Sequence, residues 1–279
     1  MPSAQTAEQL STCKVRVGAA DINMTEWGHG PTALLFHGNP DSGVMWEGIG
    51  KRLAPRLRCI APDLPGFGHS AVPPDYEPSL DGMARFVEQL VGAADIKPPI
   101  DLIAHDFGGR FALAWAIKHP SCVRRIVVMN TAFFSDYHWH FWARMWRTPV
   151  LGELSMAAMN RLMFGRELRR GGGGPMPQEH IDRTWAMITP RMKREVLRLY
   201  RASDPSVFRG WEDELIALTA VKPTLVIWGD KDPYISSRYA ERFNARKVLH
   251  LRDVGHWPPV AAPAACADAI LKFFSEDER

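Results

Sequence analysis

Three residues whose side chains can take part in nucleophilic catalysis follow short apolar runs in this sequence. Asp106 stands in "HDFGG" after "IDLIA", Asp232 closes "WGDKD" after "TLVI", and His256 lies in "VGHWPP" shortly after "KVLHL". The order carboxylate, carboxylate, histidine is that of nucleophile, acid and base in one type of catalytic triad. A single Asp after a strand is more often a helix N-cap. Three such residues in this order, each within its own local motif, favour a catalytic role over a merely structural one.

The residue at the tip of "HDFGG" determines the type of chemistry. An apolar run leads into it and a helix-compatible segment follows, as in a strand-to-helix turn that exposes a nucleophile. Many hydrolases have a serine there, which a base must activate. The Asp106 carboxylate is already anionic at pH 7 and can displace a leaving group from a saturated carbon. Water would then cleave the resulting ester, with His256 as base and Asp232 orienting its imidazole.

Eight short β-type runs predict the strands that must position these residues. They are "KVRVGA", "INMTEW", "TALLFHG", "RCIAPDL", "IDLIAHD", "RIVVMN", "TLVIWGD" and "KVLHLRD". Several are continuously apolar, as in strands covered on both faces, and helix-length segments at 80–94, 107–118 and 262–274 separate the later ones. This alternation predicts an α/β fold with a mostly parallel central sheet flanked by helices, and the first two runs predict an antiparallel edge.

The long stretch between "RIVVMN" and "TLVIWGD" contains no convincing strand and has the character of several helices. We interpret it as a helical cap inserted into the sheet domain, because the strands that follow it still need a sheet to join. The predicted core domain comprises residues 1–132 and 217–279, and the predicted cap domain comprises residues 133–216.

Two features of the predicted cap have ordinary structural explanations. The basic cluster "RELRR", Arg166 to Arg170, is interpreted as a solvated helix end. The four glycines Gly171 to Gly174 predict a mobile connection rather than a phosphate loop, because no strand precedes them and no Lys-Ser/Thr follows.

Composition and charge narrow the class of protein. The 279 residues include 34 Lys and Arg and 31 Asp and Glu, which gives a net charge of +3. So small a charge does not predict a broad electropositive surface for binding nucleic acid or an anionic membrane. The four cysteines are dispersed, so we expect no zinc site, other metal or cofactor. We see no signal peptide and no membrane-length apolar run, and therefore expect a cytoplasmic protein with a small-molecule substrate. No feature indicates an oligomeric state.

Five motifs together resemble the aspartate-nucleophile branch of the α/β-hydrolase superfamily, the group of haloalkane dehalogenases, haloacetate dehalogenases and epoxide hydrolases. The resemblance extends from Val15 to Phe274. The motifs are "HGNPDS" at 37–42, "PDLPGFGHS" at 62–70, "HDFGG" at 105–109, "WGDKD" at 228–232 and "GHWPP" at 255–259. The resemblance implies the α/β-hydrolase fold.

The resemblance also bears on the acid and the oxyanion hole. Some members carry the acid after the strand that here ends in "VVMN", where Asn130 cannot serve as an anionic partner. Asp232 is therefore predicted, with Asp230 as the alternative. The family's oxyanion hole implies that the backbone N–H groups of Asn39 and Phe107 stabilise charge developing on the nucleophile's carboxyl group.

The leaving group is suggested by residues near the nucleophile. Asn39 matches haloalkane dehalogenases, in which this side chain contacts the halide, whereas Phe107 replaces the Trp that supplies their second donor. Haloacetate dehalogenases hold the substrate carboxylate with two arginines. Arg110 matches one of these and Phe107 occupies the place of the other, which favours an uncharged or larger haloalkyl substrate.

The cap contains a candidate leaving-group pocket. "YHWHFW" at 137–142 resembles the His-Trp pair of haloacetate dehalogenases, and "LYRA" at 199–202 resembles the segment that brings their tyrosine. The match implies that His138, Trp139 and Tyr200 line the pocket. The alternative explanation of the first segment is an aromatic helix face packed on the core.

We therefore favour hydrolytic cleavage of carbon-halogen bonds through an ester on Asp106. An epoxide hydrolase giving vicinal diols is the main alternative, since Tyr137 and Tyr200 are the two cap tyrosines that could contact an epoxide oxygen. Another hydrolase of this fold and a non-catalytic hydrolase-fold binding module are further alternatives. The intact set of Asp106, Asp232 and His256 argues against the last.

Overall fold

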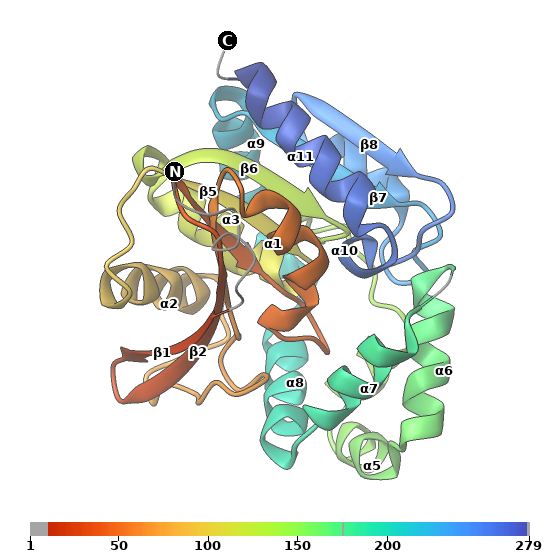
Figure 1. The fold of residues 1–279 in the computed structure, drawn as a ribbon. Coiled ribbons are helices and arrows are strands. Elements are labelled where there is room, and N and C mark those ends of the chain that lie inside the picture. Colours follow the sequence, from red (N-terminus) through yellow and green to blue (C-terminus); the bar gives the residue numbers. More distant parts are fainter. Residues whose placement is uncertain (1–10, 175, 278–279) are drawn as a thin grey trace.

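One eight-stranded sheet forms the centre of the computed structural model, which describes residues 11–174 and 176–277. The strands are β1 (Ser11–Val17), β2 (Ala20–Trp27), β3 (Thr32–Phe36), β4 (Arg58–Pro62), β5 (Ile100–His105), β6 (Val123–Met129), β7 (Thr224–Gly229) and β8 (Lys247–Leu251), in the order β1-β2-β4-β3-β5-β6-β7-β8. β2 pairs antiparallel with β1 and β4, and all the other pairs are parallel. The predicted mostly parallel sheet with an antiparallel edge is confirmed (Figure 1).

Helices surround the sheet, and those predicted at 80–94, 107–118 and 262–274 correspond to α2, α3 and α11. The helices of the described residues are α1 (Glu47–Leu53), α2 (Leu80–Ala93), α3 (Phe107–Lys118), α4 (Phe141–Arg147), α5 (Leu151–Ala158), α6 (Arg161–Gly172), α7 (Gln178–Ala186), α8 (Pro190–Ala202), α9 (Trp211–Val221), α10 (Pro258–Ala261) and α11 (Pro263–Asp277). None of them is long and apolar enough to cross a membrane. The expectation of no signal peptide partly concerns residues 1–10, which lie outside the described residues.

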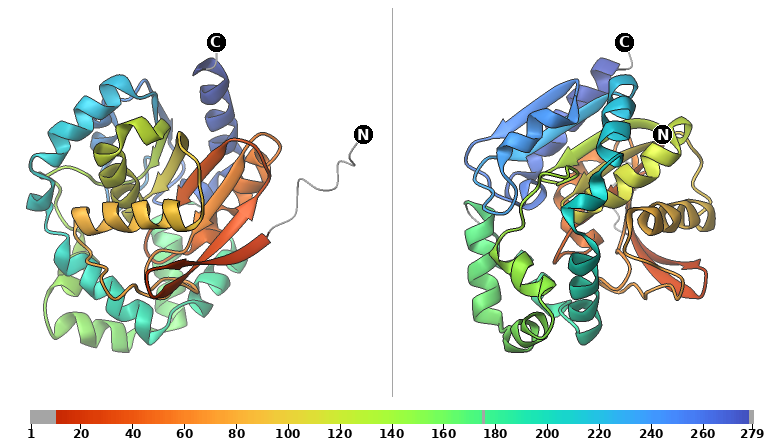
Figure 2. Two further views of the ribbon diagram at one scale, coloured as in Figure 1. Left: turned by 90° about the vertical axis from the view of Figure 1, so that its left-hand side faces the viewer. Right: turned by 180° about the vertical axis from the view of Figure 1, so that it is seen from behind.

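Two hydrophobic cores cover the two faces of the sheet. α1 packs with α11 on one face, and α2, α3 and α9 pack together on the other (Figures 1 and 2). Neighbouring residues of a strand point to opposite faces, so Leu102 of β5 joins one core and Ile103 joins the other. Burial on both faces explains why these strands are continuous apolar runs, since each large aliphatic side chain removed from water contributes about 1.5–3 kcal/mol.

The helices α4 to α8 lie between β6 and β7 in the chain and α5 to α8 gather at one end of the molecule, below the sheet in Figure 1. The division into a core of 1–132 and 217–279 and a cap of 133–216 stays a proposal. The boundary between 216 and 217 falls within α9, and α9 packs against α3 of the core. We therefore propose that the cap ends before Trp211.

Candidate active site

Asp106 lies at the tip of a tight turn between β5 and α3. Its backbone has φ 48° and ψ −124°, a conformation that L-residues rarely adopt and that is found at functional turns. The turn requires glycine at 108, because a Cβ there would lie 2.2 Å from the carbonyl oxygen of Phe36. Thr131 Oγ1 donates a 2.7 Å hydrogen bond to the Asp106 carbonyl oxygen. The turn therefore projects the carboxylate beyond the carboxyl ends of the parallel strands, where open α/β sheets bind ligands.

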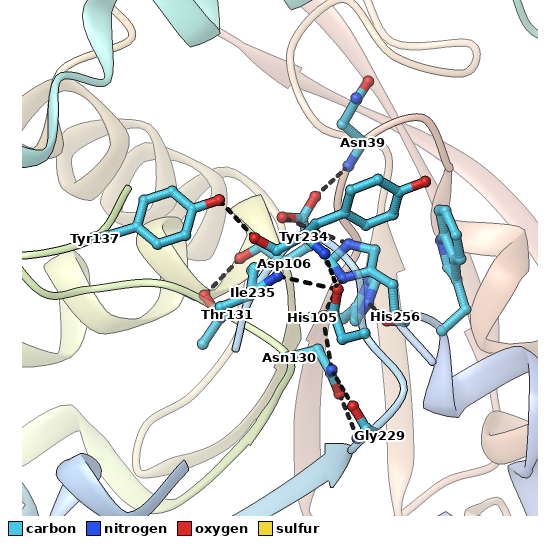
Figure 3. Close-up of polar contacts among 12 residues, drawn as sticks. Asn39, His105, Asp106, Asn130, Thr131, Tyr137, Gly229, Tyr234, Ile235 and His256 are labelled. Carbon is cyan, nitrogen blue, oxygen red and sulfur yellow. Dashed lines mark hydrogen bonds and ion pairs between the residues drawn. The ribbon is translucent and has the colours of Figure 1, made fainter. Parts of the chain in front are cut away.

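The structure brings Asp106, Asp232 and His256 together (Figure 3). His256 Nδ1 lies 2.7 Å from Asp232 Oδ2, and His256 Nε2 lies 3.8 Å from Asp106 Oδ1. The backbone N–H groups of Tyr234 and Ile235 donate to Asp232 Oδ1 at 2.7 and 3.1 Å. One imidazole thus connects a fixed buried carboxylate with a carboxylate that faces a cavity.

Asn130 is a positioning residue that the sequence analysis considered only as a missing acid. Its Nδ2 donates to Asp232 Oδ2 at 2.8 Å and to the Gly229 carbonyl oxygen at 3.1 Å, while its Oδ1 accepts from Gly229 N at 2.9 Å. Asn130 therefore holds the Asp232 carboxylate against the end of β7. Its position directly after the apolar run of β6 was the sequence feature that could have indicated this role.

Charge interactions among the three groups favour an ion pair. Burial alone would lower the pKa of His256, but the Asp232 and Asp106 carboxylates outweigh it and raise that pKa to about 10. Burial would raise the pKa of Asp106, whereas the positive charge of the neighbouring His256, whose Nε2 lies 3.8 Å away, lowers it to about 2. At neutral pH the Asp106 carboxylate therefore faces an imidazolium.

Backbone contacts fix the loop that carries His256. Gly255 N donates to Gly172 O and His256 N donates to Gly171 O, both at 2.7 Å, while His105 Nε2 lies 2.6 Å from the His256 carbonyl oxygen. The expectation that the four-glycine run is a mobile connection is wrong for Gly171 and Gly172. Gly171 and Gly172 end α6 and bind the catalytic loop, an arrangement between distant segments that the composition of the run could not show.

A cavity of about 400 Å³ opens above Asp106. Side chains of the core and of α4, α5, α6 and α8 line it, and its walls are largely apolar. Of the predicted pocket residues, it brings Asn39, Tyr137 and Tyr200 together with the carboxylate. A volume of this size suits a small organic ligand.

The predicted oxyanion donors lie beside the nucleophile. Asn39 N donates to Asp106 Oδ2 at 2.9 Å (Figure 3). Phe107 is the first residue of α3, so its N–H belongs to the donors that have no acceptor within the helix. Asn39 Nδ2 lies 3.4 Å from the Tyr200 hydroxyl, and the Tyr137 hydroxyl donates to the Tyr234 carbonyl oxygen at 3.2 Å.

The structure corrects the prediction for His138 and Trp139. His138 is exposed and lies outside the cavity, while His140 lines it. Residues 137–140 are irregular, and the helix that was expected to carry them begins only at Phe141, with His140 as its N-cap. Trp139 is not in the cavity wall. It packs on Phe107 and Tyr200, as the core-packing explanation predicted, and its Nε1 has no partner among the described residues.

Two further candidate residues, Asp230 and Arg110, do not line the cavity. Asp230, the alternative acid, binds His250 Nδ1 at 2.6 Å on the outside of the sheet edge. Arg110 is buried behind the nucleophile turn, with its guanidinium 4.2 Å from the centre of the Phe107 ring, and it does not line the cavity. Among the described residues, no cluster of three or more His, Cys, Asp or Glu side chains could hold a metal ion.

Known proteins resemble this chain in sequence. The profile of the family described as alpha/beta hydrolase fold matches residues 31–160. Haloalkane dehalogenase 2 of Mycobacterium bovis is 28% identical over 91% of this chain and 91% of its own length.

Solved structures show the same fold. Haloalkane dehalogenase DbeA from Bradyrhizobium elkani is 25% identical with a TM-score of 0.82, covering 97% of this chain and 99% of its own. Epoxide hydrolase CorEH is 20% identical, with a TM-score of 0.81, and the match covers 96% of this chain and 99% of its own. A sequence identity this low shows a shared fold alone.

Proposed function

Because the chain belongs to the α/β-hydrolase superfamily, we propose that it is an enzyme that cleaves carbon-halogen bonds through a covalent ester on Asp106. The observation that carries the proposal is the Asp106 carboxylate, which projects from the strained turn into the apolar cavity and faces His256. Relatives named haloalkane dehalogenase support the same chemistry.

The first step forms the ester. Asp106 Oδ1 attacks the saturated carbon, a carbon-oxygen bond forms, and the halide leaves with the electron pair of the broken bond. Asp106 Oδ2, which accepts from Asn39 N, remains as the carbonyl oxygen of the ester. No proton moves in this step, so an imidazolium at His256 is compatible with it.

The second step hydrolyses the ester. Esterification removes the negative charge of Asp106, which lowers the pKa of His256 and lets the imidazolium release its proton to solvent. Neutral His256 then takes a proton from water as the water oxygen attacks Asp106 Cγ. Asn39 N and Phe107 N stabilise the oxyanion, and His256 returns the proton to the leaving alcohol.

Three neutral donors near the carboxylate favour a halide as the leaving group. The Asn39 amide and the Tyr200 hydroxyl lie 3.4 Å apart in the cavity wall. Burial and the neighbouring His256 lower the pKa of His140 to about 4, and its Nδ1 accepts from Ala143 N, so the neutral ring carries its proton on Nε2. A halide needs such converging N–H and O–H donors in an apolar pocket, and His140 takes the part expected of His138.

Epoxide hydrolysis is the second candidate, because Tyr137 and Tyr200 both line the cavity. An opening epoxide needs an acidic donor on its oxygen. Burial raises the pKa of Tyr200 well above its ordinary value, and the Tyr137 hydroxyl already donates to the Tyr234 carbonyl oxygen. These two facts make dehalogenation the better candidate.

We propose a small-molecule substrate, with no nucleic-acid or membrane partner and no cofactor, and a location in the cytoplasm. The four cysteines are free thiols, which supports a reducing compartment.

One assay distinguishes the candidates. The enzyme is incubated with 1-bromobutane, 1,2-dibromoethane and styrene oxide while bromide release and diol formation are measured. Bromide release with little diol supports the proposal. Diol formation alone would select the epoxide hydrolase, and no turnover of any compound would support a binding module.

Replacing His256 with Ala should trap the intermediate. Without the base, the ester forms but is not hydrolysed, so the intact protein should gain the mass of the alkyl group, and a peptide map should locate it at Asp106. The Asp106→Ala/His256→Ala double variant is the control and should gain no mass. An adduct on a Ser or Cys would show that the nucleophile is another residue.

A further inference from the structure

The cavity above Asp106 has polar groups at two ends and an apolar wall between them. At the Asp106 end, Asn39 N and His256 Nε2 lie 2.9 and 3.8 Å from the carboxylate oxygens. Tyr200 lies 3.4 Å from the Asn39 amide, and the His140 ring centre lies 6.2 Å from that of Tyr200. The wall between the ends consists mainly of flexible or aromatic apolar side chains: Trp142, Trp146, Met156, Met159, Met163, Phe164, Leu168, Ile188, Met192 and Val196. Methionines adapt to ligands of varied shape, which suits an extended alkyl chain.

Four charged side chains of the cap line the same cavity, and three of them are cations. They are Arg166, Glu167, Arg170 and Lys193. Arg166 and Arg170 are exposed and Met163 is 48% exposed, so this end is where the cavity meets solvent. The acidic member is already engaged, because Glu167 accepts from Arg170 Nη2 at 2.7 Å and from the Tyr234 hydroxyl at 2.7 Å.

The other two cations have no carboxylate partner. Within residues 11–174 and 176–277, no hydrogen bond or ion pair of the Arg166 side chain is found, and Lys193 Nζ bonds only the neutral carbonyl oxygen of Met156, at 2.6 Å. Lys193 is half-buried, where water screens its charge less than at an open surface. The wall of the cavity therefore carries two cations, Arg166 and Lys193, that no carboxylate of the described residues compensates, next to apolar side chains.

We propose that the preferred substrate is an amphiphile with an anionic group, such as a carboxylate, at the end of an alkyl chain opposite the leaving group. The reactive carbon lies at Asp106, the chain lies along the methionine-rich wall, and the anionic group binds Arg166 and Lys193 at the mouth. This inference rests on the proposed function and names the substrate class of the same site. It also gives a role to "RELRR", which the sequence alone explained as a solvated helix end.

Geometry makes the inference sensitive to chain length. A carboxylate on a short chain would lie in the apolar section, close to the negative charge of Asp106, and would be unfavourable there. A carboxylate on a long chain reaches the cations. The enzyme should therefore prefer the acid over the matching alcohol only when the chain is long.

The test compares bromoacids with bromoalcohols of equal length. With 8-bromooctanoate we expect kcat/KM about tenfold above that with 8-bromo-1-octanol, mainly through KM, as for a hydrogen bond to a charged group. With 3-bromopropanoate against 3-bromo-1-propanol the preference should reverse. The Arg166→Gln/Lys193→Met variant should lose the long-chain preference, so that its kcat/KM for the long acid falls to its own value for the long alcohol. Arg169→Gln is the matched control, because Arg169 is exposed on the same helix and does not line the cavity.

The outcomes separate the two proposals. Equal kcat/KM for the long acid and alcohol, or a preference that survives in the Arg166→Gln/Lys193→Met variant, would overturn the substrate class while the bromide release sustains the proposed function. Failure to release bromide from any of these compounds and from 1-bromobutane would overturn the proposed function and this inference together.

Discussion

His256 lies between the carboxylates of Asp106 and Asp232. In the mechanism that we propose, the positive charge of its imidazolium has a different role in each of the two steps. In the free enzyme the positive charge keeps Asp106 ionised and ready to attack, since it lowers the pKa of that carboxyl to about 2. After ester formation only Asp232 remains as an anionic neighbour, and the proton is held less tightly. The same pair of residues therefore first stabilises the nucleophile and then provides the base.

The ion pair should make folding stability pH-dependent. The pKa of His256 is raised from 6.5 to about 10 in the fold, so its contribution is fully present below pH 6.5 and is lost as pH rises through 10. Asp106→Asn removes one of the two carboxylates and should weaken this loss. We expect Tm to fall more steeply between pH 7 and pH 10 for the wild type than for Asp106→Asn in differential scanning calorimetry. Parallel Tm profiles would contradict a contribution of Asp106 to the raised pKa of His256.

At the scale of the elements, the end of α6 is joined directly to the catalytic loop. A Cβ at position 171 would lie 2.5 Å from Trp257 Cζ3 and 2.6 Å from the Tyr234 hydroxyl oxygen, so these two side chains can pack on residue 171 only because it is glycine. The carbonyl group of Gly171 accepts from His256 N. The last turn of α6 thus acts as a positioning element for the base.

Gly171→Ala should impair the hydrolytic step more than substrate binding. The added methyl group displaces Trp257 or the α6 end, and a 1 Å misplacement of a catalytic group can cost about 10²-fold in rate. We expect kcat to fall about 10-fold or more with a smaller change in KM, and the covalent ester to accumulate in rapid-quench mass spectra. Gly172→Ala is the control, because its Cβ would meet only the flexible tip of Met176, at 3.1 Å. Equal kcat values in the two variants would contradict the positioning role.

The elements of the sheet were predictable from the sequence for a physical reason. Strands buried on both faces are continuous apolar runs, and β5, β6 and β7 are visible as such in the sequence. The start of α4 was not predictable to the residue. Capping by His140 rather than an earlier residue moved the helix start to Phe141, which put His138 outside the cavity and His140 in its wall.

At the scale of the whole molecule, a buried polar cluster ties the cap to the core. Asp41, which is 2% exposed, accepts from Trp257 Nε1 at 2.8 Å and lies 3.1 Å from His180 Nε2 and 3.3 Å from Thr184 Oγ1. His180 and Thr184 belong to α7 of the cap, and Trp257 follows the catalytic histidine. One carboxylate therefore links the cap, the loop after β3 and the loop of His256.

Asp41→Ala should destabilise the protein and loosen the cap. It leaves Trp257 Nε1 and the α7 side chains without their buried acceptor, and an unsatisfied buried polar group costs about 1–3 kcal/mol. We expect a loss on the order of 2 kcal/mol in chemical denaturation. Asp21→Ala, which removes only the exposed partner of Arg16, should change stability by about 0–1 kcal/mol. A similar small change for Asp41→Ala would show that the cluster does not hold the cap.

The sequence predicted the convergence of the triad and placed Asn39, Tyr137 and Tyr200 in the cavity wall, but it did not predict the charged residues there. Asp106, Asp232 and His256 follow parallel strands, and the carboxyl ends of such strands must meet at one edge. Arg166 and Lys193 come from two different helices, α6 and α8, and only the packing of these helices places both in the wall of one cavity. Side-chain packing between cap helices has no local sequence signature, so the proposed substrate class rests on the structure and not on the sequence.

A single turnover in heavy-oxygen water tests the central claim most directly. Enzyme in excess over 1-bromobutane converts it once in H₂¹⁸O, and the alcohol and the Asp106 peptide are analysed by mass spectrometry. Attack by Asp106 predicts unlabelled alcohol and ¹⁸O in the Asp106 carboxyl group, because the alcohol takes its oxygen from the enzyme and water restores the carboxylate. Labelled alcohol with no isotope in the Asp106 peptide would contradict the account.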